Sequence, residues 1–317
     1  MDLTGYKWTI SPQTQKQLDD IDILRKVFEK LPLPPEVIKI IRRKSIINSA
    51  VSSAQIENIP STILSPRKEG KNLESAYTWI YSSPGLPALS VKIIKDFHRK
   101  TLQGISGSAG QYRSEHWGIF NQAGIEIHHP PLHTLLPGLT SEYVDLVNNL
   151  KTHPAISAAV GQFIFEKIHP FADGNGRTGR LISTYLLHKS GYGFGGLVPL
   201  ERYIIEHRDR YYRALEPSHN CTEFIGYFLE GLISQANAVL EEIKNPPVQT
   251  SENKLHPRRR ELLETIRDHP ECSFDFLRRR FINTSQVSLH RDLQYLQKHN
   301  LIQKLGDTRG VLYTVVS

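Results

Sequence analysis

A run of twelve residues beginning at His169 brings together side chains that could do chemistry: His-Pro-Phe-Ala-Asp-Gly-Asn-Gly-Arg-Thr-Gly-Arg. His169 offers a base that titrates near neutral pH, and Asp173 offers a hard carboxylate oxygen suited to Mg²⁺. Gly174-Asn175-Gly176 lets backbone N–H groups approach an anion at the start of a helix, where the helix dipole adds attraction. Arg177 and Arg180 can each hold phosphate oxygens through two N–H groups. Together these residues indicate transfer of a phosphate-containing group.

Two other nucleotide-binding patterns fit this segment less well. Residues 174–179 satisfy GxGxxG, the dinucleotide fingerprint, and Glu201 follows at about the right distance. That fingerprint must follow a buried strand in a βαβ unit, but a proline and two polar residues interrupt the approach. A Walker A loop would need Gly-Lys-Ser/Thr, which is missing. The plain alternative for His169 is a structural histidine.

The composition indicates a soluble protein of a reducing compartment. The chain has 317 residues, which corresponds to about two domains. Apolar residues make up 39% and charged residues 22%, enough to build a packed core. Two cysteines without CxxC spacing cannot form a disulfide framework. The start has no apolar signal core, and no apolar run is long enough to span a bilayer. We therefore expect a cytoplasmic protein with no membrane partner.

The first domain, residues 1–244, is expected to be mostly helical. Apolar periodicity and helix start and stop signals indicate helices at 35–56, 141–150, 155–167, 177–189 and 225–243. Residues 125–131 differ, because alternating apolar residues followed by two prolines suggest a short extended arm or hairpin.

A proline-containing linker at 245–253 leads to a second domain at 254–317. Helices are expected at 260–268, 274–281 and 285–298, with Ser285 as N-cap, followed by strands at 301–305 and 311–315. Three helices and a hairpin form a winged helix-turn-helix pattern. The fold class is therefore mostly α, with a small amount of β-structure in both domains.

Positive charge is concentrated in this second domain. The chain has a net charge of +7, and from residue 254 onward 12 basic residues face 7 acidic ones. Such an excess suits a polyanion such as DNA, and the alternative is a solvated arginine-rich surface. The candidates for DNA contact are Gln286, Ser288, His290, Arg291, Gln294 and Arg309.

The run from His169 to Arg180 resembles the HxFx(D/E)GNGRxxR signature of Fic domains, and the resemblance covers about residues 35–240. It implies a mostly helical fold and transfer of AMP from ATP to a Ser, Thr or Tyr hydroxyl of a target protein. By matching position, His169 would deprotonate the hydroxyl and Asp173 would hold Mg²⁺. The amides of Gly174 to Gly176, with Asn175, would form the anion hole, and Arg177 and Arg180 would bind the β- and γ-phosphates.

The segment from Ser53 to Asn58 resembles the family's inhibitory motif, (S/T)xxxE(G/N), on a helix at about 40–58. Ser53 and Glu57 share one helix face. The resemblance implies that Glu57 pairs with Arg180 and thereby competes with the γ-phosphate of ATP. Some family members with this glutamate also remove AMP, so de-AMPylation stays open.

Two further assignments follow from the resemblance. The arm at 125–131 resembles the flap that holds a target by strand pairing, with Ile127 and His128 near its edge. A metal cluster of His128, His129 and His133 is the alternative, but it lacks a carboxylate or cysteine partner. Tyr211 or Tyr212 could line the adenine pocket, and core packing is the alternative.

A rival function is a DNA-binding regulator whose Fic domain senses nucleotide or is inactive. The sequence identifies neither the target protein nor the oligomeric state, so a homo-oligomer stays open.

Overall fold

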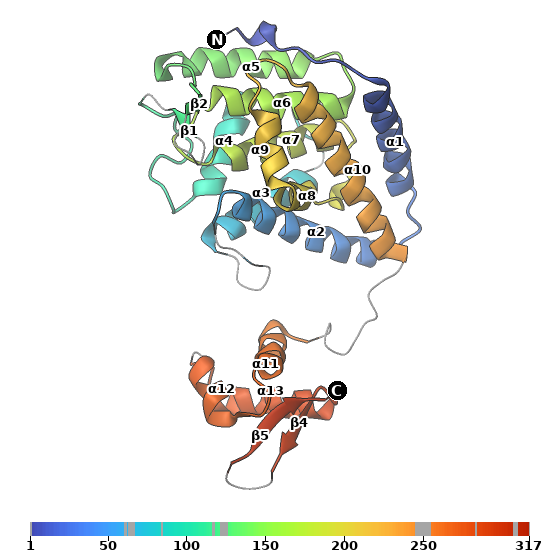
Figure 1. Cartoon of the computed structure of the whole chain (residues 1–317), viewed down its shortest axis with the longest axis vertical. Coiled ribbons are helices and arrows are strands. Elements are labelled where there is room, and N and C mark those ends of the chain that lie inside the picture. The colour runs from blue at the N-terminus through green and yellow to red at the C-terminus, as the bar shows by residue number, and fades with distance from the viewer. Residues whose placement is uncertain are drawn as a thin grey trace. The chain divides into compact units, whose positions relative to one another are not determined.

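The computed structural model divides the chain into two compact units, Met1–Glu241 and Glu242–Ser317 (Figure 1). The structure describes residues 2–59, 62, 67–83, 85–115, 118–120, 126–244, 255–282, 284–306 and 310–316. The linker predicted at 245–253 lies outside the described residues.

The first unit is built from helices, as the fold class predicts. Its α-helices are α1 Pro12–Glu29, α2 Pro35–Ile56, α3 Lys68–Ser82, α4 Val91–Leu102, α5 Leu136–Asn149, α6 Pro154–Ile168, α7 Asn175–Lys189, α8 Leu200–Glu206, α9 Arg208–Leu215 and α10 Thr222–Lys244. Single 3₁₀ turns occur at Leu3–Gly5, His133–Leu135 and Phe194–Gly196.

Helices α6 and α7 form the centre of this unit. Side chains on every face of α6 are buried, which is the pattern of a helix surrounded by protein. Helix α6 begins with Pro154 in its first turn, and the side chain of His153 accepts a hydrogen bond from the N–H of Ala155. Helix α5 packs against α6, while α3 and α4 pack against α7 (Figure 1). The core therefore fixes both helices that flank the motif.

Helix α2 brings the N-terminal segment close to α7. It begins at Pro35, whose fixed φ suits the first turn, and it ends at Ile56. Its last turns bury a row of small residues: Ser49, Ala50, Ser52, Ser53 and Ala54. These residues place the end of α2 against the helix that carries the arginines of the motif.

The extended arm predicted at 125–131 contains a strand. Strand β2, Glu126–His128, pairs antiparallel with β1, Ile119–Phe120. Ile119 pairs with His128 and Phe120 with Glu126. Ile125 lies outside the described residues.

The second unit contains three helices and a small sheet. Helices α11 Pro257–Asp268, α12 Phe274–Arg280 and α13 Gln286–Lys298 are followed by β4 Ile302–Leu305 and β5 Leu312–Val315. A short strand that the sequence reasoning missed, β3 Cys272–Ser273, completes an antiparallel sheet of order β3-β5-β4 (Figure 1). Ser285 caps α13, as predicted, by accepting a hydrogen bond from the N–H of Ser288. Leucines from all three helices form the core, among them Leu262, Leu277, Leu289 and Leu293.

Both cysteines, Cys221 and Cys272, are buried free thiols. None of the described helices combines the length and apolar character needed to cross a membrane.

Candidate active site

The motif forms a tight loop between α6 and α7. His169 ends α6 in the left-handed conformation, with φ 47° and ψ 58°, and Gly174 precedes α7 with φ 78°. The left-handed conformation is uncommon for a residue other than glycine, so the surroundings must hold it. Helix α6, not a strand, leads directly into this loop. This excludes the βαβ context of a dinucleotide fingerprint.

Phe171 and Asn175 close the loop from within. The Phe171 ring is buried and stacks on His98, with 3.7 Å between ring centroids. The amide of Asn175 pairs with both backbone groups of Phe171: Oδ1 accepts from the N–H at 3.0 Å, and Nδ2 donates to the carbonyl at 2.7 Å. The side chain of Asn175 thus holds the loop, and its contribution to an anion hole stays a prediction.

His98 pins the far end of the loop, and sequence reasoning missed it. Its Nδ1 accepts a hydrogen bond from the N–H of Gly110 at 2.8 Å, so the ring hydrogen lies on Nε2, which donates to the carbonyl of Asp173 at 2.9 Å. Burial lowers the pKa of His98 to about 4, which keeps the ring neutral in this arrangement. No local pattern marks His98, because both partners are remote in sequence.

Asp173 and Arg177 form an ion pair at the start of α7. Nη2 of Arg177 lies 2.6 Å from Oδ1 of Asp173, which also accepts from the N–H of Gly174 at 2.6 Å. The side chain of Asp173 is 66% exposed, whereas that of Arg177 is buried. Nε of Arg177 has no hydrogen-bond partner among the described residues. The loop thus presents an accessible carboxylate beside a buried cation.

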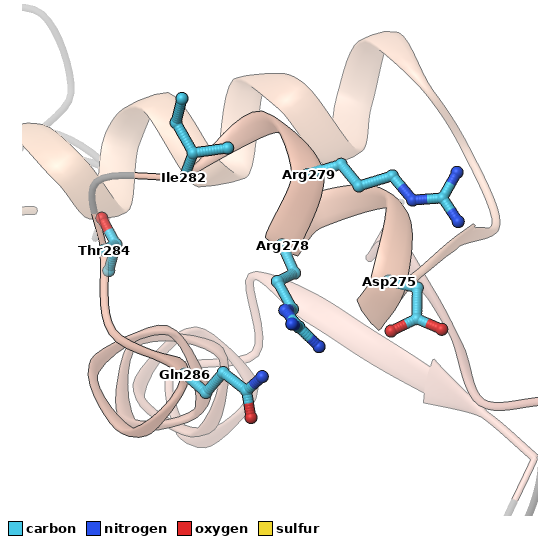
Figure 2. A pocket seen from close by; sticks show the side chains of 6 residues that line it. All are labelled: Asp275, Arg278, Arg279, Ile282, Thr284 and Gln286. Carbon is cyan, nitrogen blue, oxygen red and sulfur yellow. The ribbon is translucent and has the colours of Figure 1, made fainter.

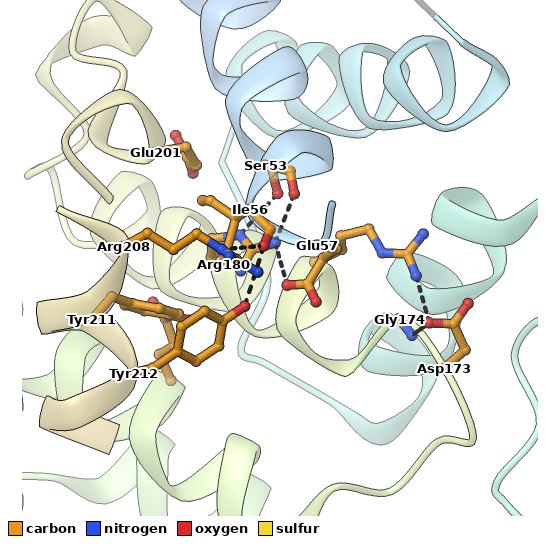
Figure 3. Close-up of polar contacts among 12 residues, drawn as sticks. Ser53, Ile56, Glu57, Asp173, Gly174, Arg180, Glu201, Arg208, Tyr211 and Tyr212 are labelled. Atoms are coloured by element: carbon orange, nitrogen blue, oxygen red, sulfur yellow. Dashed lines mark hydrogen bonds and ion pairs between the residues drawn. The ribbon is translucent and has the colours of Figure 1, made fainter. Parts of the chain in front are cut away.

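Arg180 joins α7 to the end of α2 (Figure 3). Its Nε donates to Oγ of Ser53 at 2.9 Å, and its Nη2 donates to the carbonyl of Ser53 and to Oε1 of Glu57, each at 2.9 Å. The Arg180 side chain is 1% exposed and that of Glu57 is 29% exposed. Burial alone would lower the pKa of Arg180, but the negative charge of Glu57 and nearby tyrosines raise it above its ordinary value.

The carboxylate of Glu57 also lies over the first turn of α7. A Cβ atom added at Gly176 would meet Oε1 of Glu57 at 2.3 Å and Nη1 of Arg180 at 3.1 Å. Gly176 therefore leaves the space in which an anion can approach the helix start. Nη1 of Arg180 is buried without a partner in the described part of the chain. The space beside Gly176 and the buried guanidinium of Arg180 is thus filled by a carboxylate of the chain itself.

Segment α9 holds the end of α2 in place. Nε of Arg208 donates to the carbonyl of Ile56 at 2.8 Å, and the hydroxyl of Tyr212 donates to the same carbonyl at 3.2 Å (Figure 3). Tyr211 is 1% exposed and its hydroxyl accepts from Nε2 of Gln162 at 3.0 Å. The structure thus favours the core-packing alternative for Tyr211, and leaves Tyr212 at the surface beside Glu57's helix.

Glu166 is a second carboxylate that sequence reasoning missed. It lies on α6 beside the arginine helix, since a Cβ at Gly179 would meet its Oε1 at 2.5 Å. That oxygen is buried and has no partner among the described residues. Burial, reinforced by the negative charge of Glu57, raises the pKa of Glu166 to about 8. The carboxylate that pairs with Arg180 is that of Glu57, at 2.9 Å.

The predicted flap residues Ile127 and His128 lie on β2, but their side chains fall outside the described residues. Within the described part of the chain, no group of three His, Cys, Asp or Glu side chains could hold a metal ion. The alternative of a histidine metal cluster thus finds no support among those residues.

The second unit carries an exposed basic surface on α12 and α13. Arg278, Arg279 and Arg280 end α12, and all three are exposed. Figure 2 shows the side chains of Arg278 and Gln286 next to one another in a pocket of about 590 Å³, lined also by Asp275, Arg279, Ile282 and Thr284.

The remaining candidate DNA contacts are distributed as follows. Gln286, His290, Arg291 and Gln294 are exposed and Ser288 is half-buried. Arg309 lies outside the described residues. On α11, by contrast, Arg258 and Arg259 are paired with the buried Asp292 at 2.6 and 2.7 Å.

Comparison with known proteins identifies the region around the motif. Residues 88–187 match the model of the Fic/DOC family. Protein adenylyltransferase Fic of Drosophila willistoni is 33% identical over 108 residues, which are 33% of this chain and 20% of that protein. Its counterpart from Aedes aegypti is 30% identical over 133 residues, 40% of this chain and 24% of that protein. The matches thus span about a fifth to a quarter of these relatives.

Solved structures extend the likeness in fold. A Fic family protein from Desulfovibrio desulfuricans G20 aligns over 97% of both chains, with a TM-score of 0.65 and 22% identity. A fragment of Fic-1 from C. elegans aligns over 72% of this chain and 71% of its own, with a TM-score of 0.57 and 20% identity. The motif of residues 169–180 lies within the range that the family model matches. The chain therefore contains a Fic domain.

Proposed function

We propose that the protein is an adenylyltransferase that moves AMP from ATP to a hydroxyl of a target protein. The observation that carries the proposal is the Glu57 carboxylate, which lies over Gly176 and pairs with Arg180. A place where a carboxylate lies over the amides of a helix start and beside a buried guanidinium suits an anion. Triphosphate oxygens are the anions that two buried guanidinium groups and such amides fit best.

The reaction is a displacement at the α-phosphorus of ATP. The target oxygen forms a bond to phosphorus, the bond to the bridging oxygen of the β-phosphate breaks, and pyrophosphate leaves. The imidazole of His169 accepts the proton of the hydroxyl. The amides at the start of α7, together with Arg177 and Arg180, bind the phosphates that leave and offset their growing charge.

Asp173 fits a role in holding Mg²⁺. Its carboxylate is 66% exposed beside the proposed phosphate site. Mg²⁺ commonly takes one or two protein carboxylates together with substrate phosphates and water, so one carboxylate is sufficient. The ion would supply charge neutralisation on the phosphates.

Glu57 acts as an internal inhibitor in this proposal. Arg180 cannot pair fully with the carboxylate and with a γ-phosphate at once, so ATP must displace Glu57. Ser53, Arg208 and Tyr212 hold the end of α2 through hydrogen bonds and thereby favour the inhibited state.

Labelled ATP tests the proposed reaction. The Glu57→Gly variant is incubated with Mg²⁺ and ATP carrying ³²P at either the α- or the γ-position. We expect protein-bound label from α-labelled ATP alone. Label from the γ-position would indicate phosphoryl transfer, and no label from either would exclude both activities for this chain.

The α12–α13 surface supports DNA binding as a second function. Arg278, Arg279 and Arg280 are exposed on α12, and Arg291 is exposed on α13. Arg278 lies beside Gln286, the first residue of α13 (Figure 2). Arginine contacts to phosphates would make retention on DNA fall as salt rises. Filter binding across a salt series should show this dependence, with weaker retention for Arg291→Ala. Retention that is equal for both proteins, or unaffected by salt, would contradict the assignment.

A further inference from the structure

Arg113 is a buried arginine whose side chain holds three backbone carbonyls. It lies between α4 and β1 and is 4% exposed. Its Nε donates to the carbonyl of His169 at 2.9 Å, its Nη1 to the carbonyl of Glu115 at 3.0 Å, and its Nη2 to the carbonyl of Pro131. Its backbone N–H donates to the carbonyl of Pro170 at 3.0 Å.

These carbonyls belong to two separate parts of the site. Glu115 precedes the β1–β2 hairpin and Pro131 follows it, so the guanidinium holds both ends of the hairpin. His169 is the first residue of the motif loop. One side chain therefore connects the hairpin to the backbone of the histidine.

Stability alone is a poor explanation for an arginine at this position. Burying a guanidinium costs free energy, and carbonyls carry only partial charge in return. Each side-chain hydrogen bond of Arg113 within the described residues ends on a backbone carbonyl. Burial accordingly lowers the pKa of Arg113. An apolar side chain would fill the space at lower cost, whereas only a rigid planar fork can bind three carbonyls at fixed angles.

The contact also supports the unusual backbone of His169. That residue is left-handed, a conformation that needs support from its surroundings. Its N–H donates to the carbonyl of Phe165 at 3.0 Å, and its own carbonyl is held by Arg113. A shift of the hairpin would therefore be transmitted to the backbone that carries the imidazole.

We propose that Arg113 is a positioning residue that fixes the β1–β2 hairpin, and a target segment paired with it, relative to the imidazole of His169. The catalytic part of this inference rests on the proposed function, whereas the mechanical part does not. Reactions that depend on the alignment of two groups lose about 100-fold in rate when one of them is misplaced by roughly 1 Å.

Two substitutions in the Glu57→Gly protein test the inference: Arg113→Met, which removes the hydrogen bonds, and Arg113→Lys, which keeps the charge. Amide hydrogen exchange at residues 126–129 should be at least about tenfold faster in both. ATP affinity should change by less than about twofold, while AMP transfer falls roughly 100-fold. Lysine should not rescue transfer, because one ammonium group cannot hold three carbonyls.

Arg202→Met is the matched control, since Arg202 is an exposed arginine paired with Glu206 on α8. It should leave exchange, ATP affinity and transfer unchanged. Unchanged exchange at 126–129 in the Arg113 variants would overturn the proposal, as would a parallel loss of ATP affinity and transfer. If the Glu57→Gly parent transfers no AMP, the proposed function fails and hydrogen exchange alone decides whether Arg113 fixes the hairpin. If Arg113→Met does not fold, the same criteria apply to Arg113→Lys.

Discussion

Replacing Glu57 by glutamine should have opposite effects on the nucleotide-free protein and on its complex with ATP. Glutamine keeps the size of the side chain but removes the negative charge that Arg180 faces. The free protein then retains a buried guanidinium whose partners, Ser53 and the amide oxygen of the new glutamine, carry no negative charge. ATP, by contrast, no longer has to displace a carboxylate from the site.

The size of both effects follows from burial. Breaking a fully buried ion pair costs about 3–5 kcal/mol, and an exposed pair contributes about 0–1 kcal/mol. Arg180 is 1% exposed but Glu57 is 29% exposed, so we place this pair between the two, at about 2 kcal/mol. The unfolding temperature of the first unit should fall by about 5 °C. In the variant, ATP no longer has to displace the carboxylate. The same 2 kcal/mol should therefore appear as roughly 30-fold tighter ATP binding.

Calorimetric titration with ATP and thermal unfolding without it measure the two quantities. Glu36→Gln is the matched control, because Glu36 lies on the same helix and pairs with Lys39 at 2.9 Å with both side chains exposed. It should change stability by less than about 0.5 kcal/mol and leave ATP affinity unchanged. Unchanged or weaker ATP binding by Glu57→Gln would refute the competition between carboxylate and phosphate.

Three further predictions concern titration and metal. Burial raises the pKa of Glu166 from 4.5 to about 8, so its contribution to stability is complete below pH 4.5 and is lost as pH rises through about 8. Urea unfolding across this pH range measures the loss of unfolding free energy. Glu166→Gln should make that loss smaller, by at most about 5 kcal/mol. The pKa of His98 is lowered from 6.5 to about 4. The contribution of the neutral His98 ring to the free energy of unfolding is therefore fully present above pH 6.5. We expect urea unfolding to show a loss of about 3 kcal/mol as pH falls from 6.5 through 4. Asp173→Asn should raise the Mg²⁺ concentration needed for half-maximal AMP transfer at least about tenfold, whereas metal-free ATP binding should not weaken, because Arg177 loses a competing carboxylate.

The sequence predicted the elements whose signals are local. Helix α2 begins at residue 35 and α7 ends at residue 189, as the expected ranges 35–56 and 177–189 have them, and Ser285 caps α13 as expected. The mostly helical class and the short hairpin are confirmed. Helix α5 begins at Leu136, five residues earlier than expected, because the preceding residues carry no clear cap. Strand β3 is two residues long, too short to show alternation.

The parts of the site that were missed depend on contacts between distant segments. Arg113 contacts His169 and His98 contacts Asp173, pairs that no spacing in the sequence connects. Glu166 is an ordinary polar position in the sequence, and the packing of α7 brings Gly179 close to its buried Oε1. Asn175 was assigned by position in a motif, and its actual hydrogen bonds to Phe171 depend on how tightly the loop turns.

The most direct test of the account is the intact mass of the protein after incubation with ATP and Mg²⁺. Four forms are compared over time: wild type, Glu57→Gly, His169→Ala and the double variant. We predict that Glu57→Gly gains the mass of an AMP moiety much faster than wild type, and that neither form with His169→Ala gains it. Equal and low gain in wild type and Glu57→Gly, or a clear gain in the double variant, would contradict the account.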